Sequence, residues 1–510
     1  MPASNPLLKL HASDNISVVA RRLDPGSQPL GTGPSLEQPL SAGHKIANVA
    51  IPNGGAIYKF GQIIGYASQD ISAGEHVHTH NCAFGSHDQE YEIGVDLEAA
   101  SAAIPKPAPK QFMGYRRPNG QVGTRNMIAI CATVNCSATV IRRAADKINS
   151  SGMLDDYPNV DGVAAFSHGT GCAMATNSPG YANLQRVLWG HATHANVGAA
   201  IFVGLGCEVM QIARMKTMFD SNGQERFHGL TIQDTGGTTK TIERIIEQVR
   251  ELLPEVNAIE REPVPASELK LALQCGGSDG LSGVTANPAL GAASDLLVGL
   301  GGTVILAETP EIYGAEQLLL RRAADRETAD KLIERIRWWE EYTRINNGSM
   351  DNNPSPGNKA GGLTTILEKS LGAAAKGGTT PLTEVLQYGE VSKKPGFSFM
   401  DSPGYDPASV TGQISSGAQV VVFTTGRGSA FGSKPAPTIK VATNDRLFEA
   451  MPDDMDINCG DIVSQGVSIQ DKGEQILDHV LRVASGEKSK SEALGLGDHE
   501  FVPWQIGAVM

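Results

Sequence analysis

Apolar and polar residues alternate along the first 82 residues, and no helical period stands out there. The segment LKLHASDNISVVARRL alternates around the turn-forming pair Asp14-Asn15. The segment AIYKFGQIIGYASQDISAGEHVHTHN follows as short strands separated by glycine turns. Alternation with a period of two residues is typical of half-buried strands. The pattern therefore predicts a small all-β domain over residues 1–82.

Residues 83–112 change character and become rich in alanine and proline. The stretch AASAAIPKPAPKQF contains X-Pro steps, which favour an extended backbone. We interpret residues 83–112 as an interdomain linker. A short helix that ends at Pro105 is the alternative for the first part of this segment.

From residue 113 onward, apolar runs of strand length alternate with segments of helical period. MIAICATV, DGVAAFSHG and AAIFVGLGCE are typical of strands, and TTKTIERIIEQVRELL places its aliphatic residues on one helical face. After a polar break at residues 260–268, the series continues with LKLALQCGG, GGTVILAETP, QVVVFTTGRG and PTIKVATN. Such alternation predicts mostly parallel sheets. We expect a middle α/β domain over residues 113–262 and a C-terminal domain over residues 263–510.

The overall composition excludes several classes of protein. A chain of 510 residues is too long for a single core, and its net charge of −13 argues against nucleic-acid binding. An anionic substrate would have to be met by local arginines and lysines. We find no apolar run of membrane-spanning length and no secretory signal. Seven cysteines are too few for a disulfide scaffold, so we expect a cytoplasmic protein with reduced thiols.

Three histidines alternate in the stretch GEHVHTHN, at positions 76, 78 and 80. In an extended strand these side chains would point the same way. Such a row favours a polar site that binds metal or moves protons. The alternative is the end of an exposed strand with no chemical role.

Four cysteines share one kind of position, because each follows an apolar strand and lies in or beside a turn of small residues. They are Cys136, Cys172 in SHGTGC, Cys207 in GLGCE and Cys275 in QCGGSDG. His168 and Glu208 accompany two of them. Since such turns gather at the carboxyl edge of a parallel sheet, we expect the four thiols to converge. A thiolate-rich site points to iron, an iron–sulfur cluster or zinc. The alternative is that they are simply small buried residues.

Two glycine-rich loops each carry one cation. NNPSPGNKAGG contains Lys359, and FTTGRGSAFG contains Arg427. An arginine fork can bind both oxygens of a carboxylate. The loop GYRRPNGQVGTRN adds Arg125 among others. Ordinary turns are the alternative for each loop. No dinucleotide-binding or Walker A motif is present, so we discount a dinucleotide or ATP enzyme.

With these residues in hand, the chain resembles the altronate dehydratase family, which includes galactarate dehydratases and the two-subunit sulfolactate sulfo-lyase. The resemblance covers nearly the whole chain. Its motifs include GHK at 43–45, YKFGQIIGYA, GEHVHTHN, GYRRPNGQVGTRN, SHGTGC, GLGCE, QCGGSDGLSGVTANP, NPSPGNKAGG and TTGRG. It implies an N-terminal β-clip domain of SAF type, a middle domain used for dimerisation and a Rossmann-like C-terminal domain. It also implies a homodimer that depends on Fe2+, for which Mn2+ is a possible substitute. The strand-end thiols keep an iron–sulfur cluster as an alternative.

The resemblance implies a hydro-lyase that removes water from a sugar acid of the altronate type. The candidate catalytic residues are His44, Lys45, His78, His80 and His168. The candidate substrate-binding residues are Arg125, Asn358, Lys359 and Arg427. The candidate metal ligands are Cys136, Cys172, Cys207, Cys275 and Glu208. Three alternatives stay open: a galactarate dehydratase, a sulfolactate sulfo-lyase, and a sugar-acid-binding module without catalysis.

Overall fold

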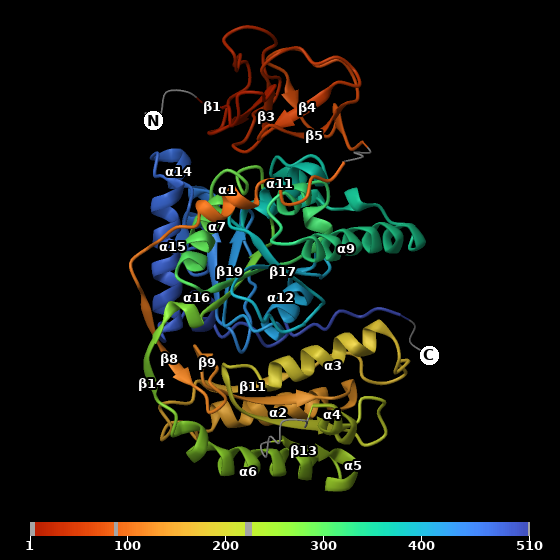
Figure 1. Cartoon of the computed structure of the whole chain (residues 1–510), viewed down its shortest axis with the longest axis vertical. Coiled ribbons are helices and arrows are strands. Elements are labelled where there is room, and N and C mark those ends of the chain that lie inside the picture. Colours follow the sequence, from red (N-terminus) through yellow and green to blue (C-terminus); the bar gives the residue numbers. More distant parts are fainter. Residues whose placement is uncertain (1–5, 86–89, 220–226, 508–510) are drawn as a thin grey trace.

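The computed structural model describes residues 6–85, 90–219 and 227–507. Three parts follow one another along the long axis of the molecule (Figure 1). The N-terminal β domain lies at one end, the middle domain lies at the other, and the C-terminal domain separates them. None of the described helices is long and apolar enough to cross a membrane.

The N-terminal domain consists of two small antiparallel sheets, as the alternation predicts. Within residues 6–85 the structure contains strands but no helix. One sheet has the order β1 (Leu7–Leu8), β2 (Ile16–Val19), β3 (Lys45–Ala47), β6 (His76–Val77), and the other has the order β4 (Ala56–Lys59), β5 (Gln62–Ala67), β7 (Cys82–Ala83). Many of its buried aliphatic residues, such as Ile57, Ile64 and Val77, belong to the same apolar cluster as those of the C-terminal domain, so the two domains share a core. Leu7, Val19, Leu36, Leu40 and Ile46 form a small separate cluster within the N-terminal domain.

The described part of the predicted linker lies against the C-terminal domain. It contains the short helix α1 (Leu97–Ala102), which agrees with the alternative of a helix before Pro105. Asp96, just before α1, forms an ion pair with Arg321. The backbone of Pro105 approaches Gly299 so closely that a Cβ there would lie 2.3 Å from the Pro105 carbonyl oxygen. The connection is therefore held on the surface rather than free.

The middle domain is built on a four-stranded parallel sheet. Its strand order is β11 (Gly162–Phe166), β10 (Met127–Ala132), β12 (Val197–Gly204), β13 (Phe227–Thr231). The helices are α2 (Asn135–Ser150), α3 (Pro179–Ala192), α4 (Ile212–Phe219), α5 (Ile232–Thr235) and α6 (Thr238–Asn257). Side chains of α2 and α6 join one apolar cluster with the sheet, whereas those of α3 join a cluster shared with the C-terminal domain.

The chain enters and leaves the middle domain through one small antiparallel sheet. In it β14 (Arg261–Pro265) pairs with β8 (Gln111–Arg116), which pairs with β9 (Val122–Gly123). The sequence break at residues 260–268 is thus a strand followed by a 3-10 turn rather than a loop. Proline is tolerated in this strand because it lies at the edge of its sheet.

A seven-stranded parallel sheet forms the centre of the C-terminal domain, which confirms the predicted fold class. Its order is β17 (Leu382–Leu386), β18 (Gly396–Met400), β16 (Thr303–Leu306), β15 (Lys270–Cys275), β19 (Val420–Thr425), β20 (Thr438–Ala442), β21 (Ile457–Asn458). The helices are α7 (Ala286–Gly299), α8 (Gln317–Leu320), α9 (Arg326–Ile345), α10 (Pro356–Ala360), α11 (Ile366–Ala375), α12 (Asp406–Ser415), α13 (Asp445–Ala450), α14 (Asp461–Ser464), α15 (Ile469–Ala484) and α16 (Lys490–Ala493). From β15 the chain passes first to β16 on one side and later to β19 on the other. Ligand sites of α/β sheets lie where the strand order diverges in this way.

The two ends of this sheet meet different domains. At the carboxyl edge, Gly280 lies against Gly43 of the N-terminal domain, and a Cβ at Gly280 would lie 2.0 Å from the Gly43 carbonyl oxygen. At the amino edge, the Gln419 side chain donates to the Val122 carbonyl, and Thr124 donates to the Gln419 carbonyl. The N-terminal domain therefore covers the edge at which ligands of parallel sheets bind.

Candidate active site between the N-terminal and C-terminal domains

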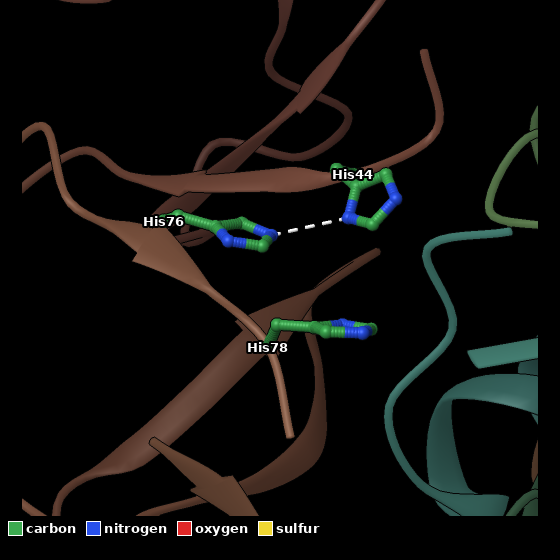
Figure 2. Close-up of side chains that lie close together, drawn as sticks. All are labelled: His44, His76 and His78. Carbon is green, nitrogen blue, oxygen red and sulfur yellow. Dashed lines mark hydrogen bonds between the residues drawn. The ribbon is translucent and has the colours of Figure 1, made fainter. Parts of the chain in front are cut away.

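Three imidazoles of the N-terminal domain face one another across two paired strands (Figure 2). Strands β3 and β6 are antiparallel with Ile46 opposite His76, so the register places His44 opposite His78. The His44 Nδ1 atom lies 3.1 Å from the His76 Nε2 atom. One ring nitrogen from each of the three lies within 4.8 Å of the other two. We call His44, His76 and His78 the histidine triad.

His80 extends this group, because its ring centroid lies 5.5 Å from that of His76. The rings at 76, 78 and 80 therefore gather as the alternation predicts, although strand β6 itself ends at Val77. His76 belongs to the histidine row found in the sequence but was not named among the candidate catalytic residues, yet its ring lies close to those of His44, His78 and His80. The alternation itself was the signal for it.

Burial keeps the triad uncharged at neutral pH. Burial, and then repulsion from neighbouring cationic groups, lowers the pKa of His76 to about 3 and that of His78 to about 4. Burial also lowers the pKa of His44. The His78 Nδ1 atom is buried and has no hydrogen-bond partner among the described residues. Neutral imidazole nitrogens that face one another are suited to a divalent transition metal.

Directly behind the triad, a buried carboxylate joins the two domains. Glu368, in α11, accepts from Lys45 at one oxygen and from Lys59 at the other, both at 2.8 Å. Lys45 also donates to the Gly362 carbonyl. Burial lowers the pKa of Lys45, and Glu368 opposes that shift. The contacts make Lys45 a docking group, and its catalytic role stays a prediction.

A second buried cluster lies at the carboxyl edge of the seven-stranded sheet. Cys275 ends β15, and Glu308 and Glu311 follow β16; one atom of each lies within 4.8 Å of the others. Lys376 lies 2.8 Å from the Cys275 sulfur, and Lys369 lies 2.6 Å from a Glu311 oxygen. Burial, and then the charge of Glu311, raises the pKa of Glu308 well above its usual range. Two ammonium groups thus already neutralise this cluster.

An open pocket of about 530 Å³ lies beside these groups, at the junction of the two domains. Arg427 and Asp279 line it from the C-terminal domain, and Ala42 and Arg22 line it from the N-terminal domain. Arg427 is exposed, and it follows β19 as the sequence predicts. Lys359 is half-buried in the short helix α10, whose residues Ala360 and the following Gly361 also line the pocket. The pocket can take an anionic small molecule.

The four strand-end cysteines do not converge, so that expectation is wrong. Cys136, Cys172 and Cys207 follow β10, β11 and β12 of the middle-domain sheet, and all three are exposed. Cys275 is buried at the carboxyl edge of the seven-stranded sheet of the C-terminal domain. The middle domain contacts the opposite, amino edge of that sheet, so Cys275 lies apart from the other three thiols. Each thiol does lie at the carboxyl edge of its own parallel sheet.

The side chains of four further candidate residues form hydrogen bonds or ion pairs with other groups of the protein. Arg125 forms a bidentate ion pair with Glu492 at 2.7 Å and donates to three backbone carbonyls. Asn358 caps α10 and donates to the Ser278 carbonyl. His168 bonds the Ala132 carbonyl and the Thr170 amide, and Glu208 accepts from Thr133 and Gly206. These contacts hold loops in place and do not support binding or catalytic roles.

Sequence reasoning also missed the buried charges of the C-terminal domain. Glu308 lies two residues after an apolar strand, and Glu368, Lys369 and Lys376 lie in or just after a largely apolar helix. Charged residues at apolar positions are rarely buried unless they are paired. Their positions in the sequence were therefore a usable signal.

Fold and site together define an α/β enzyme whose site lies between a β domain and the carboxyl edge of a parallel sheet. Three family models match the chain in succession. The altronate/galactarate dehydratase SAF domain matches residues 5–84. The second domain of D-galactarate dehydratase/altronate hydrolase matches residues 114–257, and the C-terminal domain of D-galactarate/altronate dehydratase matches residues 266–509.

Three relatives match over almost their whole length. Altronate dehydratase of Bacillus subtilis (strain 168) is 37% identical over 484 residues, which cover 94% of this chain and 95% of the relative. Altronate dehydratase of Escherichia coli (strain K12) is 36% identical over 488 residues, 95% of this chain and 96% of the relative. Galactarate dehydratase (L-threo-forming) of Escherichia coli (strain K12) is 36% identical over 493 residues, which cover 94% of this chain and 93% of the relative. The chain belongs to the altronate/galactarate dehydratase family, and it is a hydro-lyase.

Proposed function

We propose that this protein dehydrates altronate to a 2-keto-3-deoxy sugar acid. The observation that carries the proposal is the position of the histidine triad beside a pocket that contains an arginine. Ala42, two residues before His44, lines the pocket, and His44 bonds the backbone of Ala360, which lines it as well. The two relatives named altronate dehydratase, and the resemblance of GEHVHTHN to their branch, support altronate over galactarate.

Ferrous iron, which the family resemblance implies, fits the histidine triad better than the cluster around Cys275. The triad offers three neutral imidazole nitrogens as ligands, and the buried Nδ1 atom of His78 has no hydrogen-bond partner among the described residues. The Cys275 cluster already contains the ammonium groups of Lys369 and Lys376, which a divalent cation would have to displace. His44, His76 and His78 would hold Fe2+, with Mn2+ as the substitute. The ion would supply a Lewis acid that stabilises negative charge near the substrate carboxylate.

The protein's own groups meet the other requirements of the reaction. Removal of the weakly acidic C2 proton places negative charge on the substrate carboxylate, which the guanidinium of Arg427 binds at both oxygens. His80 is exposed beside the triad, and we assign it the movement of protons at C2 and at the departing 3-hydroxyl. Loss of that hydroxyl as water leaves an enol, which rearranges to the 2-keto acid.

We also propose that the protein works as a homodimer in the cytoplasm. The family resemblance supports the dimer. Its seven cysteines are all free thiols, which is usual in a reducing compartment.

A substrate screen tests the function. The purified full chain, supplied with ferrous iron and a reductant, is incubated separately with altronate, galactarate and sulfolactate, and keto acid and sulfite are measured. Keto acid formed fastest from altronate supports the proposal. A preference for galactarate, sulfite release from sulfolactate, or binding of a sugar acid without product would contradict it.

A further inference from the structure

The middle domain exposes three free thiols at one edge of one sheet. Of the seven cysteines, Cys82, Cys131, Cys275 and Cys459 are buried, whereas Cys136, Cys172 and Cys207 are exposed. Free cysteines are among the most buried residues of proteins, so exposed ones call for an explanation. The three follow the neighbouring strands β10, β11 and β12, which run parallel. Their loops therefore emerge side by side.

Backbone contacts fix these loops to one another. The Asn135 amide, next to Cys136, donates to the Thr170 carbonyl at 2.9 Å. The Met210 amide, in the loop of Cys207, donates to the Gly171 carbonyl, next to Cys172, at 3.3 Å. A Cβ at Gly171 would lie 2.2 Å from the Thr133 carbonyl oxygen, so only glycine allows this approach.

The side chain of Glu208 links two of these loops. This buried carboxylate accepts from Thr133 at 2.9 Å, in the first loop, and from the Gly206 amide at 2.6 Å, next to Cys207. These two contacts hold the loops of Cys136 and Cys207 together. Cys136 lies in the first turn of the 16-residue helix α2.

The separation of the three thiols argues against a single metal ion bound by all of them. A single zinc ion, with Zn–S bonds of about 2.3 Å, would bring its sulfur ligands to roughly 3.8 Å from one another. Among the described residues, these three thiols form no group whose ligand atoms lie within 4.8 Å. An iron–sulfur cluster has its own inorganic sulfides between the irons, so its cysteine sulfurs lie farther apart than those around one ion.

We infer that Cys136, Cys172 and Cys207 hold a [4Fe–4S] cluster at the carboxyl edge of the middle-domain sheet. This site lies in another domain from the histidine triad and does not depend on the proposed substrate. Cys275 takes no part in it. Three thiolates leave one of the four irons without a protein sulfur ligand, and that iron is open to an oxygen ligand such as water.

Reconstitution with ferric iron, sulfide and a thiol reductant under anaerobic conditions tests the inference on the full chain. Acid-labile sulfide at about four per chain is the readout, because a cluster contains inorganic sulfide as part of its structure and a single iron ion on the histidine triad does not. We expect about four iron and four sulfide per chain in the wild type, with a broad visible absorption band. Each of Cys136→Ala, Cys172→Ala and Cys207→Ala should lose most of the sulfide. Cys131→Ala, which removes a buried thiol from the same domain, should keep it.

Two results would overturn the inference. One is a wild-type protein that takes up no acid-labile sulfide, or that takes up zinc in its place. The other is a folded triple variant, judged by circular dichroism, that retains wild-type sulfide. Should the triple variant fail to fold, the single variants and the wild-type content decide the question.

Discussion

The side chain of Glu368 lies 2.8 Å from the Lys45 ammonium across the interface between the N-terminal and C-terminal domains, and both side chains are buried. Lys45 directly follows His44, so the contact that docks the domain also sets the position of the histidine triad. The site depends on this contact because neither domain contains all of the groups.

We predict that Glu368→Gln separates the two domains without unfolding the C-terminal sheet. The change leaves two buried lysines without a counter-charge, which costs on the order of 3–5 kcal/mol. Limited proteolysis should then cut between residues 83 and 112 at least ten times faster than in the wild type. Glu341→Gln breaks an exposed pair with Arg344 and should leave the rate unchanged. Equal cleavage rates in the two variants would show that Glu368 does not dock the domain.

Acid should release the same contact. Burial by itself would raise the pKa of Glu368, but Lys45 and then Lys59 lower it well below its usual range. A carboxyl group whose pKa is lower in the folded state adds stability above its unfolded pKa of about 4.3, and that stability is lost as the pH falls further. The melting temperature of the wild type should therefore fall more steeply below about pH 4.5 than that of Glu368→Gln. Parallel curves for the two proteins between pH 6 and pH 3 would contradict this prediction.

The substitution Arg427→Lys should weaken substrate binding and leave the fold intact. A lysine cannot make the bidentate contact with a carboxylate, and the exposed side chain contributes little to packing. We expect KM to rise roughly 10- to 100-fold, with the melting temperature unchanged. Arg143→Lys, at an exposed position on α2, is the matched control. A lower melting temperature together with wild-type kinetics would make Arg427 a structural residue.

Removal of a triad imidazole should lower both metal binding and turnover. His76→Ala and His78→Ala should each weaken iron binding by at least about 100-fold, measured by titration of the chelator-treated protein. His11→Ala changes an exposed histidine of the same domain and should bind iron as the wild type does. Wild-type iron affinity in both triad variants would place the metal elsewhere.

The local pattern of apolar and polar residues predicted most of the strands and helices named from the sequence. It could not predict which strands pair with one another, because that depends on contacts between segments far apart in the chain. Strands β15, β16, β19 and β20 were evident as apolar runs with small residues after them. The strand LTEVL was missed, because it is short and carries polar residues on one side. The cysteines show the same limit: each was correctly placed after a strand, but the sequence did not tell which sheet each strand joins.

The candidate site shows a similar division. Alternation predicted that His76, His78 and His80 gather. The pairing of β3 with β6, which brings His44 to them from 32 residues away, is a tertiary contact that no local pattern reveals. The ion pair of Arg125 was out of reach for the same reason, since its partner Glu492 lies 367 residues away. The positive charge of Arg125 suggested that it binds an anionic substrate, whereas in the fold it is paired with the carboxylate of Glu492.

The most direct test of the account is the rate of keto-acid formation from altronate by the iron-loaded wild type and by His78→Ala under identical reducing conditions. We predict steady formation of a 2-keto-3-deoxy acid by the wild type, its loss with a chelator, and a rate at least about 100-fold lower in the variant. Wild-type rates in the variant, or full activity of the chelator-treated wild type, would contradict the assignment of the active site to the histidine triad.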